Sequence, residues 1–413
     1  MTTPTRPHSG SEDQPERPSG PAVAASRVRP LRVLQIHTYY RQSGGEDHVV
    51  HTDEALLRRA GHDVHTYRVG NPDDASAAAA FALAAWNGRA ARQIRKFAEQ
   101  VQPDLIHVHN TWFALSPAVF ASLGQLGVPV VLTLHNYRLV CAAATLFRDG
   151  APCHDCLGTH PWHAVRHRCY RDSMLTSAVA AGTIAVHQRR QTWQRDISAF
   201  IAPSDFARER FIEGGLPGDR IVVKLHSVAD PGPRPNPPSA SRTVLFVGRL
   251  TEEKGIITLL EAWLRRPPHG LELAVIGTGP LEAELRHAAP EGVRFLGIQP
   301  NEVVLSLMLE ARALVFPSLS YEGARPLTPI EAAAAGLPVL LSDVGSMTEM
   351  FSPGADELLV PPGDVGAFGA GLAMLADDAV VDHYGAHTRR TFEANHQHDV
   401  ALRRLEQIYR SVL

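Results

Sequence analysis

The chain has 413 residues, of which 44% are hydrophobic and 20% charged, so we expect a globular protein of two or three domains. Its net charge of −3 gives no reason to expect a nucleic-acid partner. No segment approaches the roughly 20 uninterrupted apolar residues of a membrane span. Residues 1–30 contain six prolines and no apolar secretion signal, so we expect a disordered tail on a cytosolic protein with at most peripheral membrane contact.

Beyond residue 30, short apolar segments alternate with helical patterns. The strands predicted in the first half are 31–37, 62–69, 105–109, 128–135 and 199–203, and the helices are 46–60, 78–100, 117–125 and 174–194. The strands predicted in the second half are 243–247, 271–276, 293–296, 313–316, 338–342 and 357–360, with helices near 255–265, 280–289 and 301–311. This alternation predicts an α/β protein with two Rossmann-like domains, 31–228 and 243–395, facing each other across a cleft.

The predicted boundary between the domains is 229–242. Its sequence, ADPGPRPNPPSASR, has five prolines in fourteen residues, which is typical of a stiff linker. The segment 396–413 is predicted to be a C-terminal amphipathic helix, and its periodicity does not indicate where it docks.

In open α/β sheets, ligands bind at the carboxyl ends of the strands, and several turns of this chain fall there. Gly44 and Gly45 follow the first strand, where they permit close approach to a ligand or form a plain tight turn. Arg249 and Lys254 follow strand 243–247. Two cations near a helix start suit a diphosphate, although a solvated surface pair is the alternative. No turn has the Gly-Lys-Ser/Thr ending of a phosphate loop, which argues against an ATPase of that type.

Residues 313–345, ALVFPSLSYEGARPLTPIEAAAAGLPVLLSDVG, predict a strand, a loop, a helix and a second strand. Pro326 and Pro329 open the helix, and Glu331 lies in its first turn. Unpaired N–H groups at a helix start form an anion site, and a carboxylate one turn on is able to hold a ribose. The alternative is an ordinary strand–helix–strand unit with a surface glutamate.

Taken together, the motifs resemble the family 4 glycosyltransferases, which are retaining, nucleotide-sugar-dependent enzymes of the GT-B architecture. In chain order the motifs are GGE, DLIHVH, LTLHN, GRLTEEKG, IGTGP, FLG, PS–YEG–PL–IEAAAAGLPV and LLVPPGD, and they cover residues 31–413. The resemblance implies transfer from a nucleoside-diphosphate sugar, most readily a UDP-sugar, to a hydroxyl of a lipid-linked sugar, a sugar or a small molecule. Polysaccharide, glycolipid or natural-product glycoside synthesis would use such a reaction. No Asp-x-Asp motif ends a strand, so no catalytic metal or other cofactor is expected.

The resemblance also implies roles for single residues. It makes Arg249 and Lys254 the cations that neutralise the diphosphate, Glu331 the ligand of the ribose, and Glu322 a neighbour of the donor sugar. His135 would contact the sugar near the reacting carbon. The remaining nucleotide-binding positions are Leu327, Thr328, Gly248, Gly277, Phe295, Gly297 and Ile298, and the loop between diphosphate and acceptor is Gly44, Gly45 and Glu46.

Two departures from the family pattern bear on these roles. Eight residues, rather than seven, separate Glu322 from Glu331, and the extra residue lies between Gly323 and Pro326, where Arg325 stands. The orientation of Glu322 is therefore open, and Arg325 either reaches the sugar or a phosphate or points to solvent. His226 occupies a region where the family often has asparagine, and the sequence assigns it no role.

The four cysteines, Cys141, Cys153, Cys156 and Cys169, lie within 29 residues and include a Cys-x2-Cys pair. In a cytosolic protein this cluster predicts structural zinc, with unrelated buried or redox thiols as the alternative. The cysteines belong to an insertion, 139–172, that follows the His135 strand and is placed to cap an acceptor pocket. Its basic residues, which suit an anionic acceptor or simply form a solvated surface, are Arg166, Arg168 and Arg171.

Two other functions fit the same architecture. A sugar-nucleotide epimerase would need acid and base residues around the sugar, and product analysis distinguishes it from a transferase. A non-catalytic nucleotide-sugar-binding protein would bind the donor tightly and leave it intact.

Overall fold

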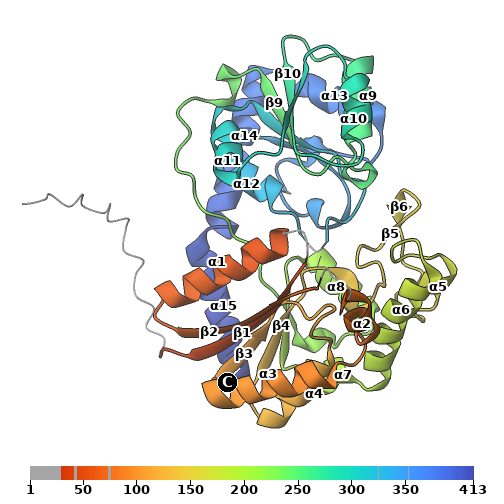
Figure 1. The fold of residues 1–413 in the computed structure, drawn as a ribbon. Coiled ribbons are helices and arrows are strands. Elements are labelled where there is room, and N and C mark those ends of the chain that lie inside the picture. Colours follow the sequence, from red (N-terminus) through yellow and green to blue (C-terminus); the bar gives the residue numbers. More distant parts are fainter. Residues whose placement is uncertain (1–28, 41–43, 73–75, 324, 352) are drawn as a thin grey trace, which may run out of the picture.

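The computed structural model of the chain describes residues 29–40, 44–72, 76–323, 325–351 and 353–413. It contains two α/β domains, each built on a six-stranded sheet (Figure 1). The predicted fold is therefore confirmed. The predicted disordered tail lies outside the described residues except for Arg29 and Pro30. None of the helices in the described part of the chain is both long enough and apolar enough to span a membrane.

The N-terminal sheet is entirely parallel, with strand order β2-β1-β3-β4-β7-β8. Its strands are β1 (Arg32–Tyr39), β2 (Asp63–Gly70), β3 (Leu105–Val108), β4 (Val130–Thr133), β7 (Ala199–Ala202) and β8 (Ile221–Val223). All residues of β3, β4 and β7 are buried, as expected for central strands covered on both sides. The helices of this domain are α1 (Gly45–Arg59), α2 (Ser76–Ala82), α3 (Gly88–Val101), α4 (Ala118–Leu123), α6 (Met174–Arg189), α7 (Thr192–Arg195) and α8 (Asp205–Glu213).

The C-terminal sheet is also parallel, with order β11-β10-β9-β12-β13-β14. Its strands are β9 (Thr243–Val247), β10 (Glu272–Ile276), β11 (Val293–Gly297), β12 (Ala313–Phe316), β13 (Val339–Ser342) and β14 (Leu359–Val360). Its helices are α9 (Ile256–Arg265), α10 (Glu282–His287), α11 (Asn301–Glu310), α12 (Thr328–Ala334), α13 (Val365–Met374) and α14 (Asp378–Asn395), with short 3₁₀ turns η5 (Glu252–Lys254) and η6 (Gly345–Met347).

Two predicted helices are each divided in the structure. The prediction of one helix over 78–100 is wrong, because α2 ends at Ala82 and α3 begins after Asn87, whose side chain accepts a hydrogen bond from Ala90 N at 3.0 Å. An asparagine cap starts a helix rather than continuing one. The prediction over 174–194 is also interrupted, since Gln191 has a positive φ of 53° between α6 and α7.

The linker 229–242 is held against the C-terminal domain. Arg234 donates hydrogen bonds to the carbonyl groups of Ala311, at 2.7 Å, and of Ala335 and Gly336, at 3.2 Å. Asp230 pairs with Arg389 of α14 at 2.8 Å. The join is therefore fastened by side chains as well as stiffened by its prolines.

The last helix, α15 (His398–Val412), returns to the N-terminal domain (Figure 1). Its apolar residues pack against one side of the N-terminal sheet, together with α1; those residues are Leu402, Leu405, Ile408 and Tyr409. The Tyr409 hydroxyl also hydrogen-bonds His107 Nδ1 at 2.8 Å. The first domain is therefore completed by the end of the chain.

The insertion 139–172 contains little regular structure. It has one small antiparallel hairpin, β5 (Phe147–Arg148) with β6 (Ala151–Pro152), and one short helix, α5 (His163–Arg166). The hairpin extends from the N-terminal domain toward the C-terminal domain (Figure 1).

Candidate functional site

A cavity of about 500 Å³ lies between the two domains and receives residues from both. Among the predicted site residues, those that line it are Gly44, Gly45, Glu46, His135, Gly248, Lys254, Glu322, Leu327 and Thr328. The predicted site residues that do not line it are Arg249, Gly277, Phe295, Gly297, Ile298 and Glu331. The structure thus brings together, from opposite domains, most of the residues that sequence motifs had indicated separately.

A charged pair dominates the C-terminal wall. Lys254, at the end of η5, donates a hydrogen bond to Glu322 Oε2, and the Ser318 hydroxyl donates to Glu322 Oε1. The Glu322 side chain is only 6% exposed, so its carboxylate is held inside its own loop. Arg249, the second predicted cation, is exposed and does not line the cavity.

Glycines close the carboxyl ends of three adjacent strands of the C-terminal sheet. Gly248 N donates to Ile276 O at 3.0 Å, and Gly277 N donates to Gly297 O at 2.8 Å. Gly277 has a φ of 137°, and a Cβ there would lie 1.9 Å from Gly248 O, so only glycine fits. Backbone atoms alone therefore form this edge, while Ile298, just beyond it, is 72% exposed.

Glu331 lies in the first turn of α12 and is half-buried. Burial raises the pKa of its carboxyl group, and a hydrogen bond from Asn301 opposes that change. The helix itself has seven residues and follows Leu327, which lines the cavity. The carboxyl group is thus close to the cavity wall without being part of it.

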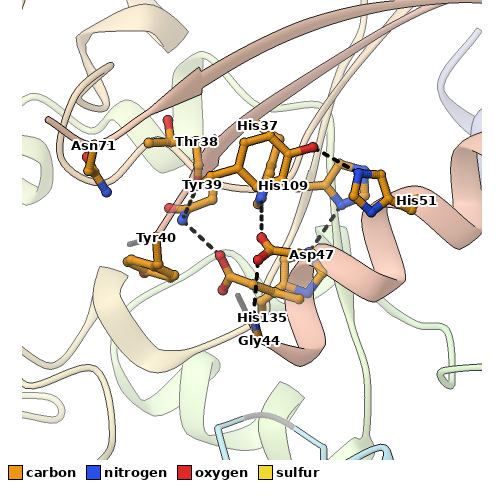
Figure 2. Close-up of polar contacts among 12 residues, drawn as sticks. His37, Thr38, Tyr39, Tyr40, Gly44, Asp47, His51, Asn71, His109 and His135 are labelled. Carbon is orange, nitrogen blue, oxygen red and sulfur yellow. Dashed lines mark hydrogen bonds and ion pairs between the residues drawn. The ribbon is translucent and has the colours of Figure 1, made fainter. Parts of the chain in front are cut away.

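The glycine loop of the N-terminal domain is anchored by a buried pair, His37 and Asp47 (Figure 2). Asp47 Oδ2 accepts a hydrogen bond from Gly44 N at 3.1 Å, and Asp47 Oδ1 lies 2.8 Å from His37 Nε2. A Cβ on Gly45 would lie 3.4 Å from Leu327 Cδ1, so the loop directly faces the start of α12 across the cavity. His37 and Asp47 thereby fix the position of the loop.

Glu46 is the half-buried carboxyl group of this wall. It accepts hydrogen bonds from Asn110 Nδ2 at 2.9 Å and from Asn136 Nδ2 at 3.2 Å. Burial raises its pKa to about 8, although the two amides favour the ionised form. Sequence reasoning missed both asparagines. A signal was available, because each follows a histidine at the end of an adjacent strand, in His109-Asn110 and His135-Asn136.

His135 belongs to a row of histidines. Its Nε2 lies 3.1 Å from His109 Nδ1, and its ring stacks on that of His226 with centroids 6.2 Å apart. Figure 2 shows His135 and His109 beside the His37–Asp47 pair. Burial lowers the pKa values of His109, His135 and His226 well below the usual range, so these rings are uncharged at neutral pH.

Arg325 stands in the segment lengthened by the extra residue. It is buried, and it lines the cavity and also pairs with a carboxylate. Its Nη1 lies 3.3 Å from Glu349 Oε1. The Glu349 carboxylate in turn accepts hydrogen bonds from the backbone N–H groups of Asp205 and Phe206, at 3.1 and 3.3 Å, at the start of α8. The prediction of a solvent-facing arginine is therefore wrong, because the extra residue contributes to a contact between the domains.

The four cysteines are half-buried and free. Burial, together with the other three thiols, raises the pKa of Cys156 to about 12, which places all four cysteines in one neighbourhood. Within the described residues, no three cysteine sulfurs lie within 4.8 Å of one another; the group that meets this criterion is His37, Glu46 and Asp47. Zinc at the cysteines stays a prediction.

Comparison with protein families gives two matches, one for each half of the chain. A model described as Glycosyltransferase Family 4 matches residues 42–224, and one described as Glycosyl transferases group 1 matches residues 241–378. Together they span both domains.

Among similar proteins, the amylovoran biosynthesis glycosyltransferase AmsK of Erwinia amylovora is 33% identical over 229 residues, covering 52% of this chain and 53% of that protein. A glycogen synthase of Mycobacterium tuberculosis is 27% identical, covering 67% of this chain and 61% of its own. The chain therefore spans less than two thirds of these two relatives. A phosphatidyl-myo-inositol mannosyltransferase of Mycolicibacterium smegmatis is 27% identical, covering 89% of this chain and 90% of its own.

Solved structures share the fold. HepE of Anabaena, in complex with UDP and glucose, superposes with a TM-score of 0.63 at 14% identity, covering 92% of this chain and 100% of that one. Sucrose-phosphate synthase of Thermosynechococcus elongatus gives a TM-score of 0.66 at 18% identity, covering 93% and 99%. At these identities the likeness concerns the arrangement of the two domains.

Proposed function

Because the chain belongs to the family 4 glycosyltransferases and has the GT-B fold, we propose that it transfers a sugar from a nucleoside-diphosphate donor to a hydroxyl acceptor. UDP is the proposed nucleotide, since a structural neighbour was solved with UDP and glucose. The observation that carries the proposal is the cavity between the domains, which combines the Gly44–Gly45 loop and His135 on one wall with Lys254 and Glu322 on the other.

On the donor side, the diphosphate would lie between Lys254, Arg249 and the glycine loop. The sugar would then extend toward Glu322 and His135, while the nucleoside follows the glycine edge of β9, β10 and β11. Glu331 is proposed to hold the ribose. A lysine that is already paired with a buried carboxylate is a fixed positive charge, and such preorganised groups stabilise the charge that develops on a leaving group.

On the acceptor side, the cavity wall is formed by Glu46, Asn136 and Arg138, with Ala143–Thr145 of the insertion beyond them. Hydroxyl groups of an acceptor are able to form hydrogen bonds with these carboxyl, amide and guanidinium groups. The acceptor is accordingly proposed to be a sugar or a sugar-bearing molecule, bound by the N-terminal domain and its insertion.

The proposed reaction breaks the bond between the anomeric carbon and the diphosphate oxygen and forms a bond from that carbon to the acceptor oxygen. The acceptor proton leaves with the released diphosphate. We propose retention of the anomeric configuration, by attack on the same face within an ion pair, because the sugar position has an uncharged histidine rather than a free carboxylate nucleophile: Glu322 is bound by Lys254 and Ser318. His135 would orient or polarise the sugar.

Ligand-dependent melting tests the donor. A nucleoside diphosphate at 100 times its dissociation constant should raise the free energy of unfolding by about 2.7 kcal/mol. We expect UDP to raise the melting temperature more than GDP or ADP does. A stronger effect of GDP or ADP would contradict the choice of UDP and leave the transferase proposal standing.

Product analysis tests the reaction. Incubation with a UDP-sugar and a panel of sugar and glycolipid acceptors should give free UDP and a glycoside of retained configuration by NMR. An epimerised nucleotide sugar, or tightly bound donor that stays intact with every acceptor, would contradict the proposal. Lys254→Gln, which removes the charge but retains an N–H donor on a side chain one atom shorter, should lose turnover.

A further inference from the structure

The insertion lines part of the cavity, contacts the C-terminal domain through one hydrogen bond and approaches it closely at a second point. His154 Nε2 lies 2.8 Å from the Tyr321 hydroxyl, and the two rings stack with centroids 5.7 Å apart. At the hairpin turn between β5 and β6, Gly150 has a φ of 77°, and a Cβ there would lie 4.0 Å from Glu252 Oε1. The insertion, whose hairpin extends toward the C-terminal domain in Figure 1, therefore bridges the two domains.

Both contacted residues are neighbours of the Lys254–Glu322 pair. Tyr321 directly precedes Glu322, and Glu252 begins η5, the 3₁₀ turn that ends at Lys254. The two contacts thus fall on the two loops that have to meet for the pair to form.

The Glu322 loop has a backbone that needs outside support. Glu322 has a φ of 55°, which is uncommon for a residue other than glycine, and Gly323 follows with a φ of 63°. Such conformations persist when the surrounding structure holds them in place. A Cβ on Gly323 would lie 3.2 Å from His135 O, so the N-terminal domain is in close contact with the loop here as well.

The Tyr321 ring is wedged between the domains. It packs edge-on against Phe206 of α8, with centroids 4.7 Å apart, and a Cβ on Gly345 would lie 2.9 Å from it. Apolar packing therefore fixes the ring plane, whereas the bond to His154 fixes the hydroxyl end. Removing that bond should loosen the turn without emptying the pocket that holds the ring.

We propose that His154 is a positioning residue, which acts through Tyr321 to hold the Glu322 loop against Lys254. The proposal rests on the proposed function, because it assigns a purpose to the pair beside the donor sugar. Since Ala143–Thr145 of the same insertion line the acceptor side of the cavity, the insertion reaches the acceptor side directly and the Glu322 loop through Tyr321. Its role is to align the donor sugar while it covers the acceptor.

Hydrogen–deuterium exchange on the full chain without ligand tests the positioning and does not depend on the reaction. The variants are His154→Ala and Tyr321→Phe, with His160→Ala as a matched control, because His160 is an exposed histidine of the same insertion. Loss of this one partly buried hydrogen bond should speed exchange in peptide 318–323 about three- to tenfold in either variant. The double variant should show no further increase, because both substitutions remove the same bond.

His154→Gln, which is able to restore a donor near the position of Nε2, should return exchange toward the wild-type rate. Unchanged exchange in His154→Ala, an equal increase in His160→Ala, or a uniform increase over both domains would overturn the proposal. These outcomes stand whether or not the protein transfers a sugar.

A kinetic measurement tests the consequence for the reaction. With the UDP-sugar that the wild type uses, His154→Ala should lower kcat about tenfold while the Kd of UDP stays within about twofold, because UDP lacks the sugar that the Glu322 loop contacts. A wild-type kcat, or a parallel loss of UDP affinity, would contradict the role in positioning the sugar. If the wild type turns over no UDP-sugar, the proposed function fails. The exchange measurement alone then tests whether His154 holds the Glu322 loop in place.

Discussion

His135 is an uncharged ring on the wall of the cavity, held by His109 on one side and stacked on His226 on the other. We expect His135 to contact the donor sugar. His135→Ala should lower kcat by about 10²-fold while the Kd of UDP is nearly unchanged, because an interaction made in the transition state does not contribute to ground-state binding. Titration calorimetry and initial rates measure the two quantities.

The melting temperature of the same variant separates this role from a structural one. A histidine that only supports the strand end would lose binding and rate together as the protein unfolds. Wild-type turnover, or a loss of rate that follows the unfolded fraction, would remove His135 from the site.

Glu322, in the loop after β12, and Glu331, in α12, differ in the hydrogen bonds that their carboxyl groups accept. Glu322 already accepts bonds from Lys254 and Ser318, whereas Glu331 has a raised pKa and its bond from Asn301. Glu331→Ala should therefore weaken UDP binding by about tenfold or more, the value of a hydrogen bond to a charged group. Glu322→Ala should have a smaller effect on UDP binding, because Glu322 is proposed to lie beside the donor sugar, which UDP lacks. Calorimetry that shows equal losses, or the reverse order, would contradict the assignment.

At the scale of elements, α15 contributes a side of the N-terminal core. Leu405 is fully buried there, so Leu405→Ala should lower the free energy of unfolding by about 2–5 kcal/mol. Arg403→Ala, on the exposed side of the same helix, should change it by no more than about 0.5 kcal/mol. Urea unfolding compares the two. Equal stability of both variants would show that α15 does not complete this domain.

We predict that the insertion 139–172 binds zinc through its cysteines. Zinc at Cys141, Cys153, Cys156 and Cys169 would brace a segment with little regular structure, and Cys153 and Cys156 flank His154 in the chain. Protein purified without a His-tag should contain one equivalent of zinc, and a Cys153→Ser, Cys156→Ser double variant should not. Metal analysis that finds less than a tenth of an equivalent in the wild type would leave these groups as ordinary thiols.

Strands were the most predictable elements, because their apolar runs end sharply. The edges of the eleven predicted strands lie within two residues of those in the structure, whereas β8, with three residues and one of them buried, was missed. Helices α8, α13 and α14 were also missed. In α13 the apolar residues surround the helix and include three glycines, so no amphipathic pattern distinguishes it.

The sequence predicted those site residues that belong to motifs directly after a strand. His135, Lys254 and the Gly44–Gly45 loop meet in one cavity because each follows a strand of its sheet. The contacts that join the domains were not predictable. The His154–Tyr321 contact, and the contact of Glu349 with the backbone N–H groups at the start of α8, connect residues with no periodic signal, across distances in the chain that only the tertiary structure closes.

For the whole molecule, buried histidines predict a response to acid. Burial lowers the pKa of His107 and of His396 to about 3, and those of His109, His135 and His226 also fall. An unfolded histidine has a pKa of about 6.5, so below that pH the unfolded chain binds more protons and the free energy of unfolding decreases. The raised pKa values of Glu46, Glu331 and Glu349 act in the opposite direction, but on fewer groups.

Urea unfolding at pH 7, 6 and 5 should therefore show a steady loss of stability. Each buried histidine contributes up to about 1.4 kcal/mol per pH unit below its unfolded pKa. His107→Gln, which keeps hydrogen-bonding groups but cannot be protonated, should reduce the slope, and exposed His160→Gln should not. A flat profile in the wild type would contradict the neutral state of these rings.

The return of α15 to the first domain has a consequence for the order in which the protein is assembled on the ribosome. The sheet surface formed by Val33, Leu105, Val131 and Ile201 is made early, yet the helix that covers it is translated after the whole second domain. The second half of the chain is thus free to finish folding while the first still exposes an apolar surface. Such surfaces are where nascent chains aggregate or recruit chaperones, so synthesis of this protein passes through a period of vulnerability that ends only with its last helix.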